Sequence, residues 1–129
     1  MINNSPSGVM LDASVILELF LVRKKYDEVR NIIKEYEVKY ITPITIGILF
    51  YFAERGKIDM LSAEALVNGC QILNISESTY TMARHLYKGK DLEDAVQIAC
   101  AIENNISCVI TLNKDMQTKY AALIDMVKC

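Results

Sequence analysis

Acidic residues stand at three points of this sequence where an apolar, strand-like run meets a helix-like one. The three stretches are Leu11-Asp12-Ala13-Ser14, Asp91-Leu92-Glu93-Asp94-Ala95 and Thr111-Leu112-Asn113-Lys114-Asp115. Residues just beyond the carboxyl ends of parallel strands lie along one edge of a sheet, where ligands bind. Carboxylates collected there repel one another unless a hard cation neutralises them, and oxygen-ligated Mg²⁺ or Mn²⁺ is the usual cation. The pattern therefore predicts a metal site.

Each acid also has a purely structural interpretation. Asp12 is suited to capping a first helix, and Asp91 is suited to capping a later one, with Asp94 favourably placed near the helix dipole. Asn113 is a third potential cap, with Asp115 in the first turn that follows it. Capping does not explain why all three junctions fall on the same edge of the sheet, so we favour metal binding.

Apolar runs and stretches of helical period alternate along the chain. Strand-like runs fall at 9–11, 38–41, 71–75, 107–112 and 123–127. Helix-like stretches fall at 15–22, 26–36, 43–55, 62–69, 76–87 and 91–104, and a short helix begins at Lys114. Strands that alternate with helices favour an α/β fold whose mostly parallel sheet is covered by helices on both faces.

The segment 43–55 is locally ambiguous. Ile44, Ile46 and Ile48 alternate with smaller residues as in a half-buried strand. However, the apolar character continues to Ala53, and Thr42-Pro43 is a typical helix start. We therefore expect a helix here.

Length and composition indicate one globular domain that spans residues 1–129. The chain is 52% hydrophobic and 23% charged, and no apolar run approaches the roughly 20 residues of a membrane helix. The first residues lack the basic and apolar regions of a secretory signal, so we expect a cytoplasmic protein with no membrane partner. A net charge of -2 neither predicts nor excludes nucleic acid.

The four cysteines are dispersed along the chain. Cys70, Cys100, Cys108 and Cys129 form no C-x-x-C pair and have no neighbouring histidine. This spacing argues against a zinc site and against a disulfide framework, so we expect reduced and mostly buried thiols.

At the acidic stretches the chain resembles the PIN domain, a metal-dependent ribonuclease family that includes the toxins of VapBC-type toxin-antitoxin pairs. The segment from Val9 to Val15 is similar to the family's opening L-D-[ST]-[NS]-V. Asp91-x-x-Asp94-Ala95 is similar to its D-x-x-D-A helix start, and the segment from Thr111 to Asp115 resembles its closing T-x-[DN] motif. The resemblance extends over nearly the whole chain.

The resemblance implies a three-layer α/β/α sandwich around a mostly parallel sheet of four or five strands. It also implies an acidic pocket with Mg²⁺ or Mn²⁺, cleavage of RNA phosphodiesters, a small antitoxin partner and a homodimer. The resemblance assigns metal-binding and catalytic roles to Asp12, Asp94 and Asp115 of this chain. It assigns supporting roles to Ser14, Asp91, Thr111 and Asn113.

One position departs from the family pattern. The family usually carries a Glu in a segment like T-P-L-T-x-x-E-L, and this chain has Ile48 in that place. Glu54 lies six residues further on, about 9 Å along a helix, and is a poor substitute. We therefore expect weaker metal affinity and slow or absent turnover, and the alternative is a nuclease-incompetent PIN scaffold that binds protein or RNA.

A phosphoacceptor regulator of receiver type is a third interpretation of an α/β chain with an acid after its first strand. Such a protein needs an acceptor Asp at the end of its third strand. The corresponding segment here is Ile72-Leu73-Asn74-Ile75-Ser76, which disfavours that interpretation.

Overall fold

Five parallel strands form one sheet in the computed structural model, which describes residues 8–87 and 89–127. The order across the sheet is β3-β2-β1-β4-β5. The strands are β1 (Gly8–Leu11), β2 (Val38–Ile41), β3 (Gln71–Ile72), β4 (Cys108–Ile110) and β5 (Asp125–Val127). All four neighbouring pairs are parallel, which confirms the predicted sheet.

Within the described ranges, seven helices connect the strands. They are α1 (Ala13–Phe20), α2 (Tyr26–Ile33), α3 (Pro43–Glu54), α4 (Met60–Asn68), α5 (Glu77–Leu86), α6 (Leu92–Glu103) and α7 (Lys114–Tyr120). The ambiguous segment 43–55 is helical, as expected, because Thr42 accepts a hydrogen bond from the backbone N–H of Thr45 and Pro43 occupies the first turn.

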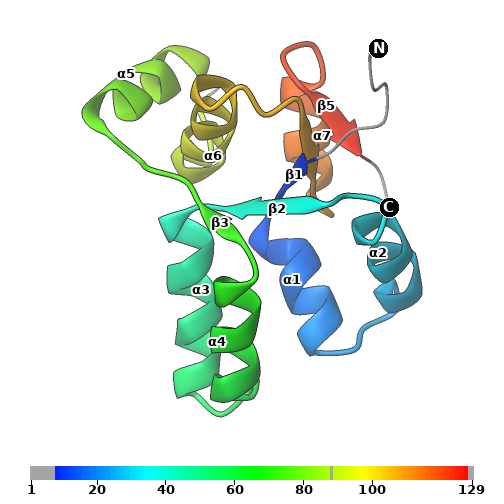
Figure 1. Cartoon of the computed structure of the whole chain (residues 1–129). Coiled ribbons are helices and arrows are strands. Elements are labelled where there is room, and N and C mark those ends of the chain that lie inside the picture. Colours follow the sequence, from blue (N-terminus) through cyan, green and yellow to red (C-terminus); the bar gives the residue numbers. More distant parts are fainter. Residues whose placement is uncertain (1–7, 88, 128–129) are drawn as a thin grey trace.

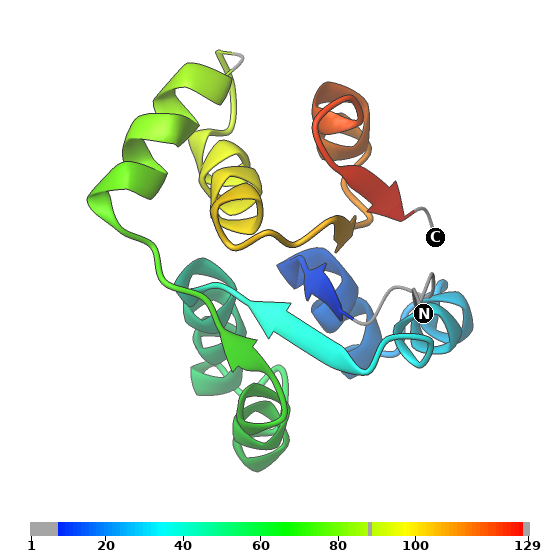
Figure 2. The same cartoon turned by 45° about the horizontal axis from the view of Figure 1, so that its top comes forward.

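The helices form two layers, one on each face of the sheet (Figures 1 and 2). Val9 and Leu11 of β1 pack with α1 to α4 on one face, whereas Met10 packs with α5, α6 and α7 on the other. Successive residues of a strand point to opposite faces, so this one strand contributes to both cores. The three-layer α/β/α sandwich predicted from the sequence is confirmed.

The direction in which the chain builds the sheet reverses between β1 and β4. The chain goes from β1 outward to β2 and β3, and then returns through α5 and α6 to place β4 on the other side of β1. Such a reversal is a topological switch point, and ligands of open parallel sheets bind there, beyond the carboxyl ends of the strands. The acidic stretches that contain Asp12 and Asn113 follow these two strands.

The edge strand β3 is shorter than the predicted 71–75. Only Gln71 and Ile72 pair with β2, and both side chains are exposed. An exposed edge strand gains little from burial, so the ladder ends early and the apolar pattern of the sequence overestimates its length.

The cysteines that the structure describes are free thiols. Cys100 and Cys108 are buried and Cys70 is partly buried, as expected, whereas Cys129 lies outside the described residues. Within the described part of the chain, no helix has the length and apolar character needed to cross a membrane.

The N-cap of α4 gives a local test of the fold. Asp59 Oδ2 accepts the backbone N–H of Ser62 at 2.9 Å, so we expect Asp59→Ala to lower the free energy of unfolding by about 1 kcal/mol. Urea denaturation measures this loss. Asp27→Ala is the control, because Asp27 lies in the first turn of α2 without serving as its cap, and an equal loss in both variants would contradict the assignment.

Candidate functional site

Asp12 is a buried carboxylate at the switch point of the sheet. It directly follows β1, its backbone N–H donates to the carbonyl of Ile110 in β4 at 3.1 Å, and only 8% of its surface is exposed. Its Oδ2 accepts the hydroxyls of Ser14 at 2.7 Å and Thr111 at 2.8 Å. Its Oδ1 accepts the side-chain amide of Gln97 at 2.9 Å. Three separate segments therefore hold this one carboxylate.

Ser14 and Thr111 also connect the start of α1 to the loop after β4. The Ser14 Oγ accepts the backbone N–H of Leu112 at 3.0 Å, and the Thr111 Oγ1 accepts that of Asn113 at 3.0 Å. The two hydroxyl oxygens lie 3.3 Å apart. Both residues were predicted to support the site, and both contact Asp12 directly.

Asn113 links the loop after β4 to the start of α6. Its Nδ2 donates to Asp94 Oδ2 at 3.3 Å, while its Oδ1 caps α7 by accepting the backbone N–H of Met116 at 3.2 Å. Asn113 therefore does both things that the sequence suggested, capping a helix and contacting the acidic cluster.

Asp94 lies in the first turn of α6, close to other negative charges. Burial raises the pKa of its carboxyl to about 6, and the charges of Asp12, Asp91 and Glu93 add to this rise, while Lys119 opposes it. Two acids far apart in the sequence, Asp12 and Asp94, are therefore brought within electrostatic reach of each other, as the sequence predicted. A cation between them would relieve the repulsion.

The hydroxyl of Tyr120 lies near the same acids. Tyr120 is fully buried in α7, and its hydroxyl has no hydrogen-bond partner within the described chain. Burial raises the pKa of this phenol, as do the charges of Asp94 and then Asp91. A buried polar group without a protein partner usually holds a water molecule or a ligand atom.

Asp91 does not cap α6 in the way expected. It occupies the N-cap position, but its side chain makes no capping hydrogen bond and its backbone has the left-handed φ of 58°. The capping interpretation of Asp91 is therefore wrong. A side chain cannot reach the helix amides from this conformation, and the carboxylate of Asp91 instead adds negative charge near Asp94 and Tyr120.

Asp115 is the predicted acid that the structure does not bring into the cluster by contact. It is exposed at the start of α7, and its Oδ2 lies 3.4 Å from Lys90 Nζ. Among the residues that the structure describes, no group of three or more Asp, Glu, His or Cys side chains is arranged to hold a metal ion. The predicted set of Asp12, Asp94 and Asp115 is thus reduced to a pair of acids with Asn113 beside it.

Gln97 is the residue of this cluster that sequence reasoning missed. It lies three positions after Asp94 in α6, is only 3% exposed, and joins Asp12 to α3. The available signal was a polar residue inside the otherwise apolar run from Ala95 to Ala101. Ile48, the departure from the family pattern, lies on α3 and is partly buried.

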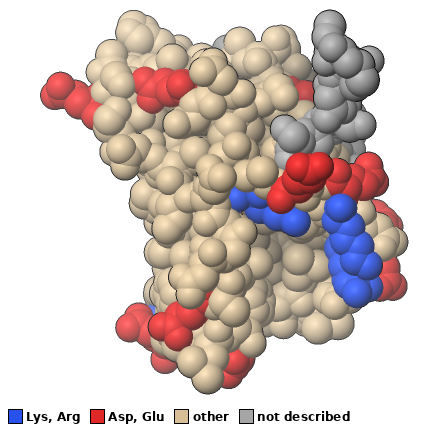
Figure 3. Space-filling model, viewed as in Figure 1, with Lys and Arg blue, Asp and Glu red and all other residues tan. Residues whose placement is uncertain are grey.

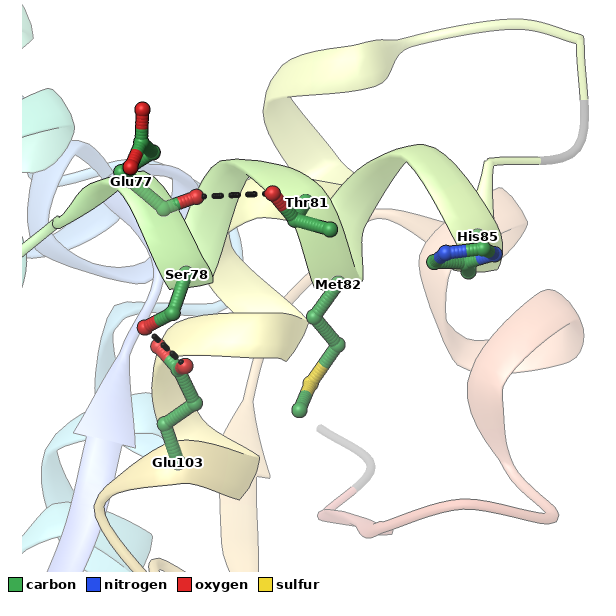
Figure 4. Close-up of a pocket in the computed structure, with 6 residues that line it drawn as sticks. All are labelled: Glu77, Ser78, Thr81, Met82, His85 and Glu103. Atoms are coloured by element: carbon green, nitrogen blue, oxygen red, sulfur yellow. Dashed lines mark hydrogen bonds between the residues drawn. The ribbon is translucent and has the colours of Figure 1, made fainter.

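A separate hollow of about 570 Å³ lies between α5 and α6 (Figure 4). Its lining comprises Glu77, Ser78, Thr81, Met82, His85 and Glu103. The hydroxyl of Ser78 donates to Glu103 at 2.7 Å, and that of Thr81 donates to the carbonyl of Glu77 at 3.1 Å. The lining includes none of the predicted site residues, so this hollow is not part of the acidic site.

The raised pKa of Asp94 predicts a stability that depends on pH. The pKa of Asp94 is about 6 in the folded chain and near 3.8 in the unfolded chain. The contribution of Asp94 to the free energy of unfolding is therefore fully present below about pH 4 and is lost as the pH rises through about 6. In EDTA, Asp94→Asn should be more stable than the native chain at pH 8 by about 1 to 3 kcal/mol and equal to it near pH 4. Urea denaturation across this range measures the difference.

Asp115→Asn is the control for that comparison, because Asp115 is exposed and paired with Lys90. It should show a smaller and flatter difference from the native chain. A loss of stability at pH 8 in Asp94→Asn would contradict the electrostatic description of this carboxylate.

Solved structures with the same fold belong to toxin-antitoxin systems. A toxin-antitoxin complex from Klebsiella pneumoniae matches with a TM-score of 0.72 and 20% identity, covering 92% of this chain and 95% of the other. VapC20 from Mycobacterium tuberculosis, described as a sarcin-ricin loop cleaving toxin, matches with a TM-score of 0.74 and 14% identity, covering 94% and 99%. VapBC-1 from nontypeable Haemophilus influenzae matches with a TM-score of 0.66 and 17% identity, covering 94% and 97%.

These identities are low enough that the structures establish only the fold. No curated protein matches the sequence significantly. The family model of the PIN domain, however, matches residues 9–122. That range contains all three acidic stretches and every element from β1 to α7, and this chain therefore belongs to the PIN domain family.

Proposed function

We propose that this protein is a metal-dependent endoribonuclease of PIN type with weakened activity, and that Asp12 and Asp94 hold Mg²⁺ or Mn²⁺. The observation that carries the proposal is the approach of these two acids at the switch point, where their mutual repulsion contributes to the raised pKa of Asp94. The hydroxyl of Tyr120 is within electrostatic reach of Asp94 and is buried without a partner among the described residues, which supports a site that holds solvent or a ligand.

The residues present fit a hard divalent cation. Mg²⁺ is usually bound by one or two carboxylates, and waters and substrate phosphates complete its coordination. Asp12 and Asp94 supply the two carboxylates, and no soft ligand lies in the cluster of Asp12, Ser14, Thr111, Asn113 and Asp94. When bound, such an ion polarises a phosphoryl oxygen and lowers the pKa of an attacking water.

The side chains around the two acids have positioning roles in this proposal. Ser14 and Thr111 fix Asp12 by hydrogen bonds, and Asn113 fixes Asp94. Asp115 acts through solvent, because its contact is with Lys90. Asp91 increases the negative potential near Asp94. Ser14, Thr111 and Asn113 therefore orient the two acids before a substrate arrives.

Two features account for weakened activity. Ile48 provides no carboxylate where the family usually has Glu, and Asn113, which contacts Asp94, is neutral. Both reduce the negative charge that attracts a cation. The carboxylates that remain are still oriented, so we expect slow turnover.

The substrate and partners follow from the family and from the systems to which the matched structures belong. We propose an RNA substrate, a small antitoxin protein as partner, a homodimer and a cytoplasmic location. Lys90 and Lys119 supply positive charge next to the acidic site. On the face shown in Figure 3, basic and acidic described residues lie side by side and broad areas are uncharged. We place RNA at the acidic edge because the proposed metal ion and these two lysines lie there.

The alternative function is that of a nuclease-incompetent scaffold that binds protein or RNA. The specific observation in its favour is that both oxygens of Asp12 already accept hydrogen bonds from protein groups. A carboxylate satisfied in this way does not require a cation. This alternative predicts a pocket that is stable and inactive without metal.

RNA cleavage tests the proposed function directly. With structured and single-stranded RNA and Mn²⁺, we expect slow cleavage by the native chain, loss of cleavage in Asp12→Asn, and at least about tenfold faster cleavage in Ile48→Glu. Gel analysis of end-labelled RNA over hours, at enzyme excess, measures the rates. No cleavage by either the native chain or Ile48→Glu would favour the scaffold.

Metal binding is tested separately by thermal unfolding during Mn²⁺ titration. A metal that binds the folded state stabilises it by about 2.7 kcal/mol at 100 times its Kd. We expect the melting temperature of the native chain to rise with Mn²⁺, and the rise to disappear in Asp12→Asn and Asp94→Asn. Asp27→Asn, an exposed substitution on α2, is the control and should respond like the native chain. A flat response in the native chain would refute metal binding.

A further inference from the structure

Gln97 is a buried amide in a place where the surrounding residues are apolar. It is 3% exposed, and its neighbours in α6 from Ala95 to Ala101 are mostly buried aliphatic or small residues. An amide taken out of water costs free energy unless its donors and acceptor find partners. An apolar side chain of similar size would avoid that cost, so the hydrogen bonds of Gln97 need an explanation.

The partners of Gln97 fix the orientation of its amide. Its Oε1 accepts the hydroxyls of Thr42 at 2.8 Å and Thr45 at 3.4 Å, both of which are fully buried. Its Nε2 donates to Asp12 Oδ1 at 2.9 Å. A flipped amide would direct its oxygen at a carboxylate, which only accepts hydrogen bonds, so the observed orientation is the one that satisfies all four groups.

The hydrogen bonds of Gln97 connect α3 to Asp12. Thr42, the N-cap of α3, and Thr45, in its first turn, donate hydrogen bonds to the Gln97 amide oxygen. The amide nitrogen of Gln97 in turn donates to Oδ1 of Asp12. The hydroxyls of Ser14, in α1, and Thr111, in the loop after β4, donate to the other oxygen, Oδ2. Donors on both oxygens restrict both side-chain torsions of Asp12, χ1 and χ2, more than donors on one oxygen alone.

We propose that Gln97 is a positioning residue of the acidic site: its amide, oriented by Thr42 and Thr45, holds the Asp12 carboxylate in its observed orientation at the switch point of the sheet. The role in metal affinity rests on the proposed function, whereas the orientation of Asp12 does not. Because Ile48 offers no acid from α3, the two threonines and Gln97 are the connection through which α3 acts on the site.

The first experiment uses the metal-free protein. Gln97→Met keeps the length of the side chain and removes the amide, and the neighbouring α6 residues Val96 and Ile98 are already apolar. We expect NMR coupling constants to show one χ1 rotamer of Asp12 in the native chain and averaging among rotamers in Gln97→Met. A single, unchanged rotamer of Asp12 in the folded variant would overturn the proposal.

The second experiment measures Mn²⁺ affinity by calorimetry. Loss of a group that orients a metal ligand typically weakens affinity by about 10- to 100-fold, and we expect a loss of that size in Gln97→Met. Thr45→Val removes one of the two donors to Gln97 with little change in shape, so it should weaken affinity in the same direction by a smaller factor. Thr42→Ser keeps the hydroxyl and should bind Mn²⁺ like the native chain.

Gln117→Met is the matched control. Gln117 also donates a side-chain hydrogen bond, at 2.7 Å, but to the backbone carbonyl of Thr111 and not to a carboxylate. It should leave the Asp12 rotamer unchanged. Equal Mn²⁺ affinity in the native chain and Gln97→Met would overturn the positioning role.

The two experiments also separate this proposal from the proposed function. If the native chain binds no Mn²⁺, the proposed function fails, and the Asp12 rotamer in the metal-free variants still decides whether Gln97 positions that carboxylate. If Gln97→Met does not fold, the Asp12 rotamer and the Mn²⁺ affinity of Thr45→Val test the positioning role in its place.

Discussion

The hydrogen bonding of one buried carboxylate, that of Asp12, is the constraint on which the rest of the site depends. A buried charge is tolerated only when its oxygens find donors. The donors come from α1, from the loop after β4 and from α6, and they meet at Asp12 because β4 lies next to β1 in the sheet. The strand order is therefore as important to this site as the residues themselves.

The starts of several helices follow from local chemistry and were accessible from the sequence. Thr42 with Pro43, Ser76 with Thr79, and Asn113 each start a helix through short-range hydrogen bonds that the residue types already indicate. The extent of β3 was not accessible, because the length of an edge strand depends on how much of its surface another layer covers. The backbone conformation of Asp91 was also not accessible, because Asp tolerates a left-handed φ more readily than most residues but does not require one.

Some contacts of the site could be predicted from the order of the strands, whereas others depend on how segments distant in the sequence pack together. The joining of Asp12, Asp94 and Asn113 followed from the single rule that parallel strands end at one edge. The ion pair of Asp115 with Lys90 depends on how the segment before α6 lies against α7, which no pattern encodes. Gln97 was missed for a similar reason: its partners are 52, 55 and 85 positions away in the sequence.

Under the proposed function, the neutral residues Ile48 and Asn113 weaken metal binding and also limit repulsion in the metal-free chain. The pKa of Asp94 is raised first by burial and then by the negative charge of Asp12. A third or fourth carboxylate would bind a cation more tightly, but it would also increase the repulsion in the metal-free chain. Hydrogen bonds from Gln97, Ser14 and Thr111 instead stabilise Asp12 without a cation. Under the proposed function, such a site stays folded and oriented at low metal concentration, but it has less negative charge with which to attract the cation.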